Sequence, residues 1–107
     1  MTDNDKHPLR LTGKQKKLLR GLGHHLEPIV YVGREGLSVS LINSTSDALG
    51  VHELIKVKLG RNCPVGKKDA AEQLAFKTDS ALVQLIGKTV LLYQPNPDLP
   101  KEKRISV

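Results

Sequence analysis

The order of strand-like and helix-like patterns most constrains the fold of this chain. Residues 29–32 form a short β-branched-rich run between Pro28 and Gly33, and its unbroken apolar character is typical of a strand covered on both faces. A loop follows, and apolar residues then recur at helical spacing over residues 37–49. Gly50 stands where a glycine commonly ends a helix. These patterns predict a strand, a loop and a helix, in that order.

A helix start is predicted near the N-terminus. Thr12 and Gln15 have the spacing of a capping box, in which each side chain accepts a hydrogen bond from the other residue's backbone N–H. An apolar stripe that we expect to be buried follows at Leu18, Leu19 and Leu22. Residues 1–9 have no periodicity, and we expect a flexible lead there.

Four further segments complete the pattern. Residues 53–59 alternate as a strand does, and residues 69–77 are compatible with a helix. Residues 81–86 and 89–93 are strand-like runs joined by a Gly-Lys pair that suits a type II′ hairpin turn. After them, three prolines and several cations predict that residues 95–107 form an extended basic tail.

The predicted order is a helix followed by β-α-β-α-β-β, in one domain over residues 10–94. A strand-helix-strand unit favours a parallel pair with a right-handed crossover, and the terminal hairpin adds an antiparallel pair. We therefore predict an α/β (α+β two-layer) fold with a mixed four-stranded sheet.

The chain is basic, with 17 Lys and Arg against 11 Asp and Glu among 107 residues. This balance favours an anionic partner, either nucleic acid or an anionic membrane. No apolar run approaches the roughly 20 residues that span a bilayer, and no secretion signal is visible, so we expect a cytoplasmic protein without a membrane partner. Three aromatic residues are too few for the stacking sheet of an RNA-recognition motif.

The loop Gly33-Arg34-Glu35-Gly36 is the most informative motif. Two glycines let a backbone approach a phosphate, and the start of a helix attracts anions. KH domains clamp a nucleic-acid backbone with the same G-x-x-G device. An ordinary tight turn explains the tetrapeptide equally well, and Glu35 partly offsets Arg34. If the loop contacts RNA, we expect Gly36→Asp to weaken binding without loss of the fold.

Cations also cluster along the chain. No acidic residue lies between positions 10 and 20, where five cations occur: Arg10, Lys14, Lys16, Lys17 and Arg20. Lys56 and Lys58 share one face of a predicted strand. Such a run is often only a solvated helix face, but unmixed charge favours an anionic partner.

The chemistry-bearing residues do not form a catalytic pattern. His24, His25 and the single Cys63 lack zinc-ligand spacing, and no base stands at a motif-defined distance from Cys63. Adjacent strand residues such as His52 and Glu53 point to opposite faces. We expect no enzyme activity, no metal, no cofactor and no small-molecule substrate.

Several blocks of sequence together resemble the YhbY family, the bacterial stand-alone form of the CRM (chloroplast RNA splicing and ribosome maturation) domain. The likeness covers about residues 10–94, and its blocks are Leu11–Gln15, Leu22–His24, Pro28–Val30, Gly33–Leu37, His52–Lys58 and Gln84–Tyr93. The resemblance implies a fold similar to the C-terminal domain of translation initiation factor 3. It also implies RNA binding without catalysis and, in bacteria, a role with the precursor of the large ribosomal subunit.

The resemblance implies the G-x-x-G loop as an RNA contact, flanked by the basic first helix and one strand face. Our candidate RNA-binding residues are Gly33, Arg34, Glu35, Gly36, Lys14, Lys17, Arg20, Lys56, Lys58 and Lys88. Gln94 departs from the family, where an Arg often follows the last strand. We expect a monomer that binds ribosomal RNA or the large-subunit precursor. The alternatives are a module that binds a ribosomal protein or assembly factor without RNA, and a small enzyme acting on RNA or nucleotides.

Overall fold

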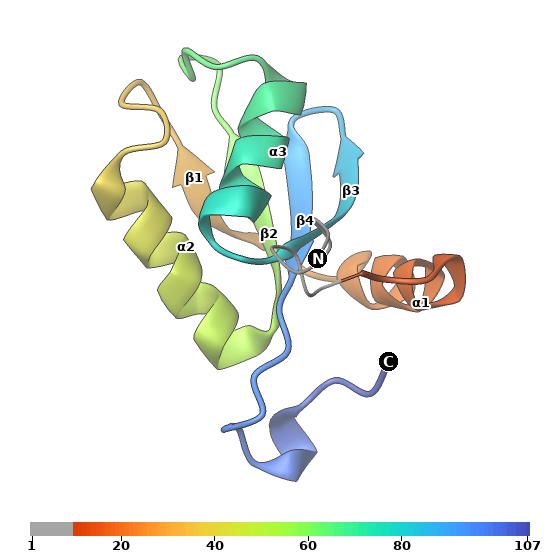
Figure 1. The fold of residues 1–107 in the computed structure, drawn as a ribbon. Helices are drawn as coiled ribbons and strands as arrows, with labels where there is room; N and C mark the ends of the chain where they lie inside the picture. The colour runs from red at the N-terminus through yellow and green to blue at the C-terminus, as the bar shows by residue number, and fades with distance from the viewer. Residues whose placement is uncertain (1–9) are drawn as a thin grey trace, which may run out of the picture.

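The computed structural model describes residues 10–107, so the predicted lead at 1–9 lies outside the described residues. Three helices and four strands follow one another in the predicted order (Figure 1). Their bounds are α1 Gly13–Gly23, β1 Pro28–Val32, α2 Val39–His52, β2 Leu54–Leu59, α3 Lys67–Lys77, β3 Ala81–Ile86 and β4 Thr89–Tyr93, with a 3-10 turn at Lys101–Lys103. The capping box is confirmed, because Thr12 and Gln15 exchange both hydrogen bonds.

The sheet is mixed, as predicted, with the strand order β1-β2-β4-β3. β1 and β2 are parallel and are connected through α2, whereas β4 is antiparallel to both of its neighbours. The β3–β4 turn has Gly87 at φ +57°, and Lys88 has no positive φ, as a type II′ turn requires. The C-terminal ends of β1 and β2 therefore lie at the same end of the sheet as the hairpin turn.

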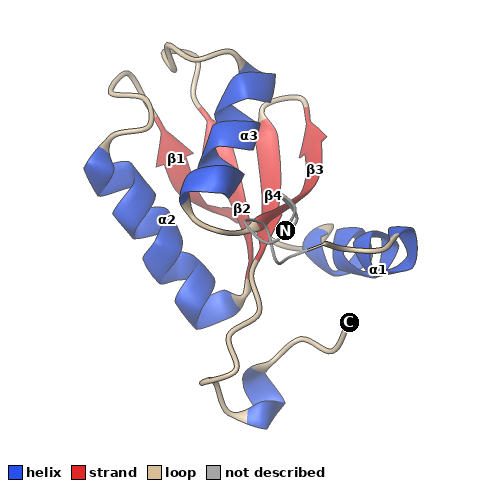
Figure 2. Ribbon diagram, in the orientation of Figure 1, coloured by secondary structure: helices blue, strands red, loops and turns tan. Residues whose placement is uncertain are grey.

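The main core fills the space between the sheet and the pair α2 and α3, which cover one face (Figure 2). Leu49 of α2 and Leu74 of α3 are completely buried there, together with Val57 of β2. The alternation predicted for β2 is thus confirmed, because its odd-numbered residues enter this core. Its even-numbered residues point to the opposite face, which carries the candidate site.

α1 packs on part of that opposite face, around a second apolar cluster. Leu19 is completely buried and contacts a cluster formed by Leu54, Val83, Leu91 and Tyr93. A Cβ on Gly23 would lie 2.7 Å from the Leu91 side chain, so a larger residue at this position would require Leu91 to shift. The predicted stripe is only partly buried, since Leu18 and Leu22 are each 44% exposed.

Two predictions about local structure are wrong. β1 is an edge strand, and Ile29 and Tyr31 on one of its faces are exposed rather than covered. The apolar run did not reveal this because α1 reaches β2, β3 and β4 but leaves β1 open. α2 starts at Val39 and continues through Gly50 to His52, and the residue after it, Glu53, takes the positive φ of 65°.

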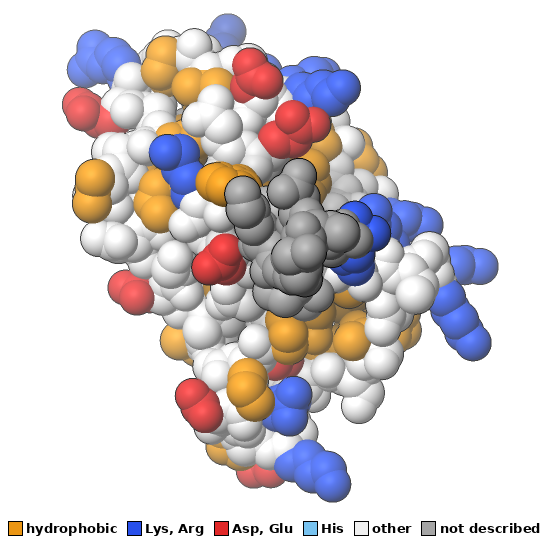
Figure 3. Space-filling view, viewed as in Figure 1, with side chains coloured by type: hydrophobic (Ala, Val, Ile, Leu, Met, Phe, Trp, Pro, Cys, Tyr) orange, Lys and Arg blue, Asp and Glu red, His pale blue; other side chains and the backbone are white. Residues whose placement is uncertain are grey.

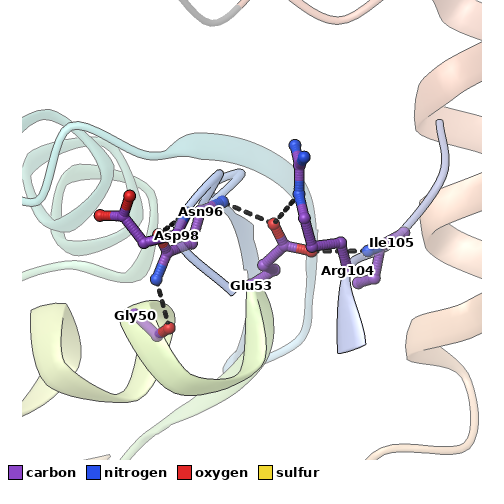
Figure 4. A network of polar contacts seen from close by, with 6 residues as sticks. All are labelled: Gly50, Glu53, Asn96, Asp98, Arg104 and Ile105. Carbon is purple, nitrogen blue, oxygen red and sulfur yellow. Dashed lines mark hydrogen bonds and ion pairs between the residues drawn. The ribbon is translucent and has the colours of Figure 1, made fainter. Parts of the chain in front are cut away.

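The C-terminal segment folds back on the domain, which differs from the predicted extended tail. The carboxylate of Glu53 is completely buried and accepts hydrogen bonds from the backbone N–H groups of Asn96 and Ile105 (Figure 4). Arg104 places its Nε 3.9 Å from the same carboxylate. Ile105 packs against the cluster under α1. A buried anion with donors from the segment thus holds the tail in place.

The Tyr93 phenol, which lies near this network, makes the stability of the protein depend on pH in the alkaline range. Burial raises the pKa of the Tyr93 phenol above 10.0, the nearby Glu53 carboxylate adds to this effect, and Arg104 opposes it. The folded protein therefore holds the phenol proton more tightly than the unfolded chain does. Its contribution to stability is complete below pH 10 and is lost as the pH rises through the folded-state pKa.

We expect the free energy of unfolding to fall more steeply above pH 10 in the wild type than in Tyr93→Phe. Urea unfolding at pH 8, 10 and 11 measures this difference. Because both proteins carry the same lysines, subtracting the two curves removes their titration. Parallel curves would contradict the coupling.

Candidate nucleic-acid interface

The glycine loop forms a tight turn at the end of β1. The N–H of Gly36 donates to the carbonyl oxygen of Gly33 at 3.0 Å, and Arg34 and Glu35 are exposed at the tip. Gly36 has φ +67°, and a Cβ there would lie 3.2 Å from Cγ of Pro64. The two glycines therefore differ: Gly36 is required by the turn, whereas a Cβ on Gly33 would meet no atom within 4 Å.

This geometry corrects two expectations. Gly36→Asp would strain the backbone and crowd Pro64, so it is unsuited to a test that requires an intact fold. The loop also does not open α2 directly, because Leu37 and Ser38 intervene. The Ser38 hydroxyl caps α2 by accepting from the N–H of Leu41 at 3.1 Å.

Three loops meet at this end of the sheet. The N–H of Gly60 donates to Val32 O at 2.8 Å, which joins the loop after β2 to the start of the glycine loop. The N–H of Leu59 donates to Lys88 O at 2.7 Å, which joins β2 to the hairpin turn. The structure thus brings Lys88 and the glycine loop, which are more than 50 positions apart in sequence, to one end of the domain.

Lys56 and Lys58 lie on the sheet face that α1 only partly covers. Lys56 is half-buried, and Lys58 is exposed near the end of β2 that leads towards the loops. A hollow of about 440 Å³ lies beside the contact between the C-terminal part of α1 and the sheet, and its lining includes Arg20, His24 and Lys56. The hollow therefore joins the basic side of α1 to the basic strand.

The remaining predicted cations continue this surface along α1. Lys14, Lys17 and Arg20 follow at intervals of three residues, which places neighbouring side chains on one side of a helix. Lys and Arg side chains project at the edge of the molecule over α1, whereas the face of α2 and α3 mixes acidic and basic groups (Figure 3). α1 and the four strands together contain six Lys and Arg residues and no carboxylate.

Some residues of this surface were not predicted from the sequence. Tyr31 is 65% exposed on the open face beside Lys58, and Gln84 and Thr89 line the hollow. An unbroken apolar strand gave no signal for the exposure of Tyr31. Gln94 does not point to this surface, because its amide donates to the carbonyl oxygens of Thr78 and Asp79. It joins the end of α3 to the end of β4.

The His, Cys, Asp and Glu side chains within residues 10–107 do not cluster as metal ligands do. No group of three or more His, Cys, Asp or Glu side chains in this range could hold a metal ion. The thiol of Cys63 contacts the carbonyl oxygen of Val65 at 3.5 Å. No helix in the same range has both the length and the apolar character needed to cross a membrane.

Comparison with known proteins identifies a related group. The family model of the CRS1 / YhbY (CRM) domain matches residues 11–94. The probable RNA-binding protein YqeI of Bacillus subtilis is 46% identical over 82% of this chain and 92% of its own length. An RNA-binding protein of Haemophilus influenzae is 39% identical over 82% of this chain and 89% of its own length.

A solved structure has the same fold. The solution structure of the hypothetical protein SAV1595 from Staphylococcus aureus superposes with a TM-score of 0.73 at 39% sequence identity. The match covers 91% of this chain and all of that one. The α+β architecture with its mixed sheet is therefore shared with a homologue.

Proposed function

Because the chain belongs to the CRS1 / YhbY (CRM) domain family, we propose that it binds RNA, mainly through the phosphate backbone. The observation that carries this proposal is the unmixed positive surface, which extends from α1 across the hollow to β2. Cations without competing carboxylates attract a polyanion. RNA is the polyanion that we favour, because the relatives from B. subtilis and H. influenzae are named as RNA-binding proteins.

The glycine loop is proposed as a backbone contact at one end of this surface. Its exposed tip, Arg34 and Glu35, lies at the end of the sheet that also carries Lys88. Gly33 leaves open space where a side chain would stand, so a phosphate oxygen can approach the main chain there. Arg34 and Lys88 are positioned to neutralise it.

Gly33→Asp tests the loop without disturbing the turn. A carboxylate placed in the open space beside Gly33 should repel phosphate, so we expect RNA affinity to fall about tenfold, a loss of roughly 1.4 kcal/mol. Fluorescence anisotropy with a labelled RNA hairpin measures the affinity. Gly33→Asn is the matched control, because it fills the same space without the charge and should bind RNA more tightly than Gly33→Asp but less tightly than the wild type.

Thermal unfolding of both variants must match the wild type, since no atom lies within 4 Å of the added Cβ. Wild-type RNA affinity in both Gly33→Asp and Gly33→Asn would remove the loop from the interface. The wider proposal would then rest on α1 and β2 alone.

The proposed RNA is ribosomal RNA in the precursor of the large subunit, bound by a monomer during assembly. This narrower statement rests on the family resemblance of the sequence blocks. Crosslinking in cells, followed by sequencing of the attached RNA, tests it after each fragment is normalised to its cellular abundance. Enrichment of precursor segments that maturation removes supports the proposal. Fragments that only follow abundance would contradict it, and co-sedimentation with ribosomal particles that survives ribonuclease would favour a protein partner.

A further inference from the structure

The open face of the sheet carries a row of side chains that runs across all four strands. Register pairs Tyr31 with Lys58, Lys58 with Thr89, and Thr89 with Ile86, so the four side chains lie next to one another. Tyr31 is 65% exposed and Ile86 is 63% exposed. Within residues 10–107, α1 covers the other half of this face and leaves the row uncovered.

The hollow beside this row offers unused polar groups. Gln84 and Thr89 line it, and neither side chain has a hydrogen-bond partner within residues 10–107. Neighbouring strands lie about 4.8 Å apart, so Tyr31 and Thr89, two strands apart, are separated by roughly 10 Å. The aromatic ring and the hollow are therefore close enough to contact adjoining parts of one ligand.

Charge identifies the class of ligand. Lys58 stands between Tyr31 and Thr89, Lys56 and Arg20 line the hollow, and no strand carries a carboxylate. A protein segment able to cover the apolar side chains would not need this excess of cations. A nucleotide satisfies both features, because its base stacks on an aromatic ring while its phosphate pairs with a cation.

We propose that an unpaired nucleotide of the bound RNA stacks its base on Tyr31 and that Lys58 pairs with the phosphate of this nucleotide. The hollow beside the row of side chains is then open to the neighbouring base. This inference rests on the proposed RNA binding and adds a preference for RNA structure to it. Base faces are closed off within a duplex, whereas loops, bulges and single strands expose them. The open sheet face thus selects unpaired RNA, while the basic surface holds the backbone of any RNA.

The test compares Tyr31→Ala and Tyr31→Phe on two probes, a labelled 12-nucleotide single strand and a labelled 12-base-pair RNA duplex. Loss of one stacked base should weaken binding of the single strand by about tenfold in Tyr31→Ala. Tyr31→Phe keeps the ring and should bind within twofold of the wild type. Duplex binding should be unchanged in both variants.

Phe76→Ala is the matched control, because it removes an exposed aromatic ring from α3 on the other side of the sheet. It should leave the affinity for both probes unchanged. Thermal unfolding must show that each variant is folded.

If Tyr31→Ala binds the single strand as tightly as the wild type does, the stacking is overturned, but the proposed RNA binding stands. Equal losses on the single strand and the duplex would also overturn it, because the residue would then act on the backbone. If the wild type binds neither probe, the proposed function itself fails. If Tyr31→Ala no longer binds a protein that the wild type binds, while its RNA affinity is unchanged, the open face is a protein-docking surface and the proposal is contradicted.

Discussion

Raising the salt concentration from 50 to 200 mM should weaken RNA binding by about a hundredfold or more. Apart from the loop cations Arg34 and Lys88, which would add to the effect, the positive surface offers five cations for phosphates: Lys14, Lys17, Arg20, Lys56 and Lys58. Each phosphate neutralised on a single strand contributes about 0.7 to the slope of log affinity against log salt concentration, so five contacts give a slope near −3.5. A fourfold increase in salt then lowers the affinity by about two orders of magnitude.

Anisotropy titrations at 50, 100 and 200 mM KCl measure this slope. The double variant Lys56→Gln, Lys58→Gln should reduce its magnitude by about 1.4, because two contacts are lost. Lys68→Gln with Lys103→Gln is the control, since these exposed cations lie on α3 and in the C-terminal segment and neither lines the hollow. An affinity that stays constant with salt would reject backbone binding, and an unchanged slope in the first double variant would remove β2 from the interface.

Replacing Glu53 with Ala should lower the free energy of unfolding by about 3 kcal/mol. Its buried carboxylate accepts two backbone hydrogen bonds from the C-terminal segment and lies near Arg104. Hydrogen bonds to a charged group contribute about 1.5–3 kcal/mol each. If the segment detaches in the variant, water solvates the freed N–H groups, and part of the lost free energy is recovered. Urea unfolding measures the total loss, and hydrogen exchange at Asn96 and Ile105 reports whether the segment detaches.

Two companion variants separate the carboxylate from the backbone. Glu53 has φ 65°, which glycine adopts freely and alanine does not, so Glu53→Gly should be more stable than Glu53→Ala by about 1 kcal/mol. Glu102→Gln removes an exposed carboxylate from the same segment and should change stability by less than about 0.5 kcal/mol. Wild-type stability in Glu53→Ala, with the two amides still protected, would show that the carboxylate does not hold the segment.

Local signals in the sequence were sufficient for most of the fold. The capping box at Thr12 and the hairpin glycine at Gly87 each act over a few residues, so their outcome does not depend on distant contacts. The alternation in β2 likewise predicted which residues enter the main core. Gly50 misled the prediction of the end of α2, because the helix tolerates a glycine and the chain reverses instead at Glu53.

The candidate interface was less predictable. Sequence identified the basic character of α1 and β2 and the glycine loop, because charge and composition are local properties. It could not show that Arg20 and Lys56 line one hollow, since that depends on where α1 packs on the sheet. It also could not distinguish the roles of Gly33 and Gly36, because only the neighbouring Pro64 and the backbone angle separate them.

Patterns between near neighbours were enough to predict the order of the elements and the parallel crossover, and the excess of positive charge and the family resemblance are likewise visible in the sequence. The tertiary structure decided which half of the open sheet face α1 covers, and hence that Tyr31 remains exposed beside Lys58. It also decided that the tail folds back onto Glu53. These outcomes depend on contacts between residues far apart in the chain, whose free energies no local pattern encodes.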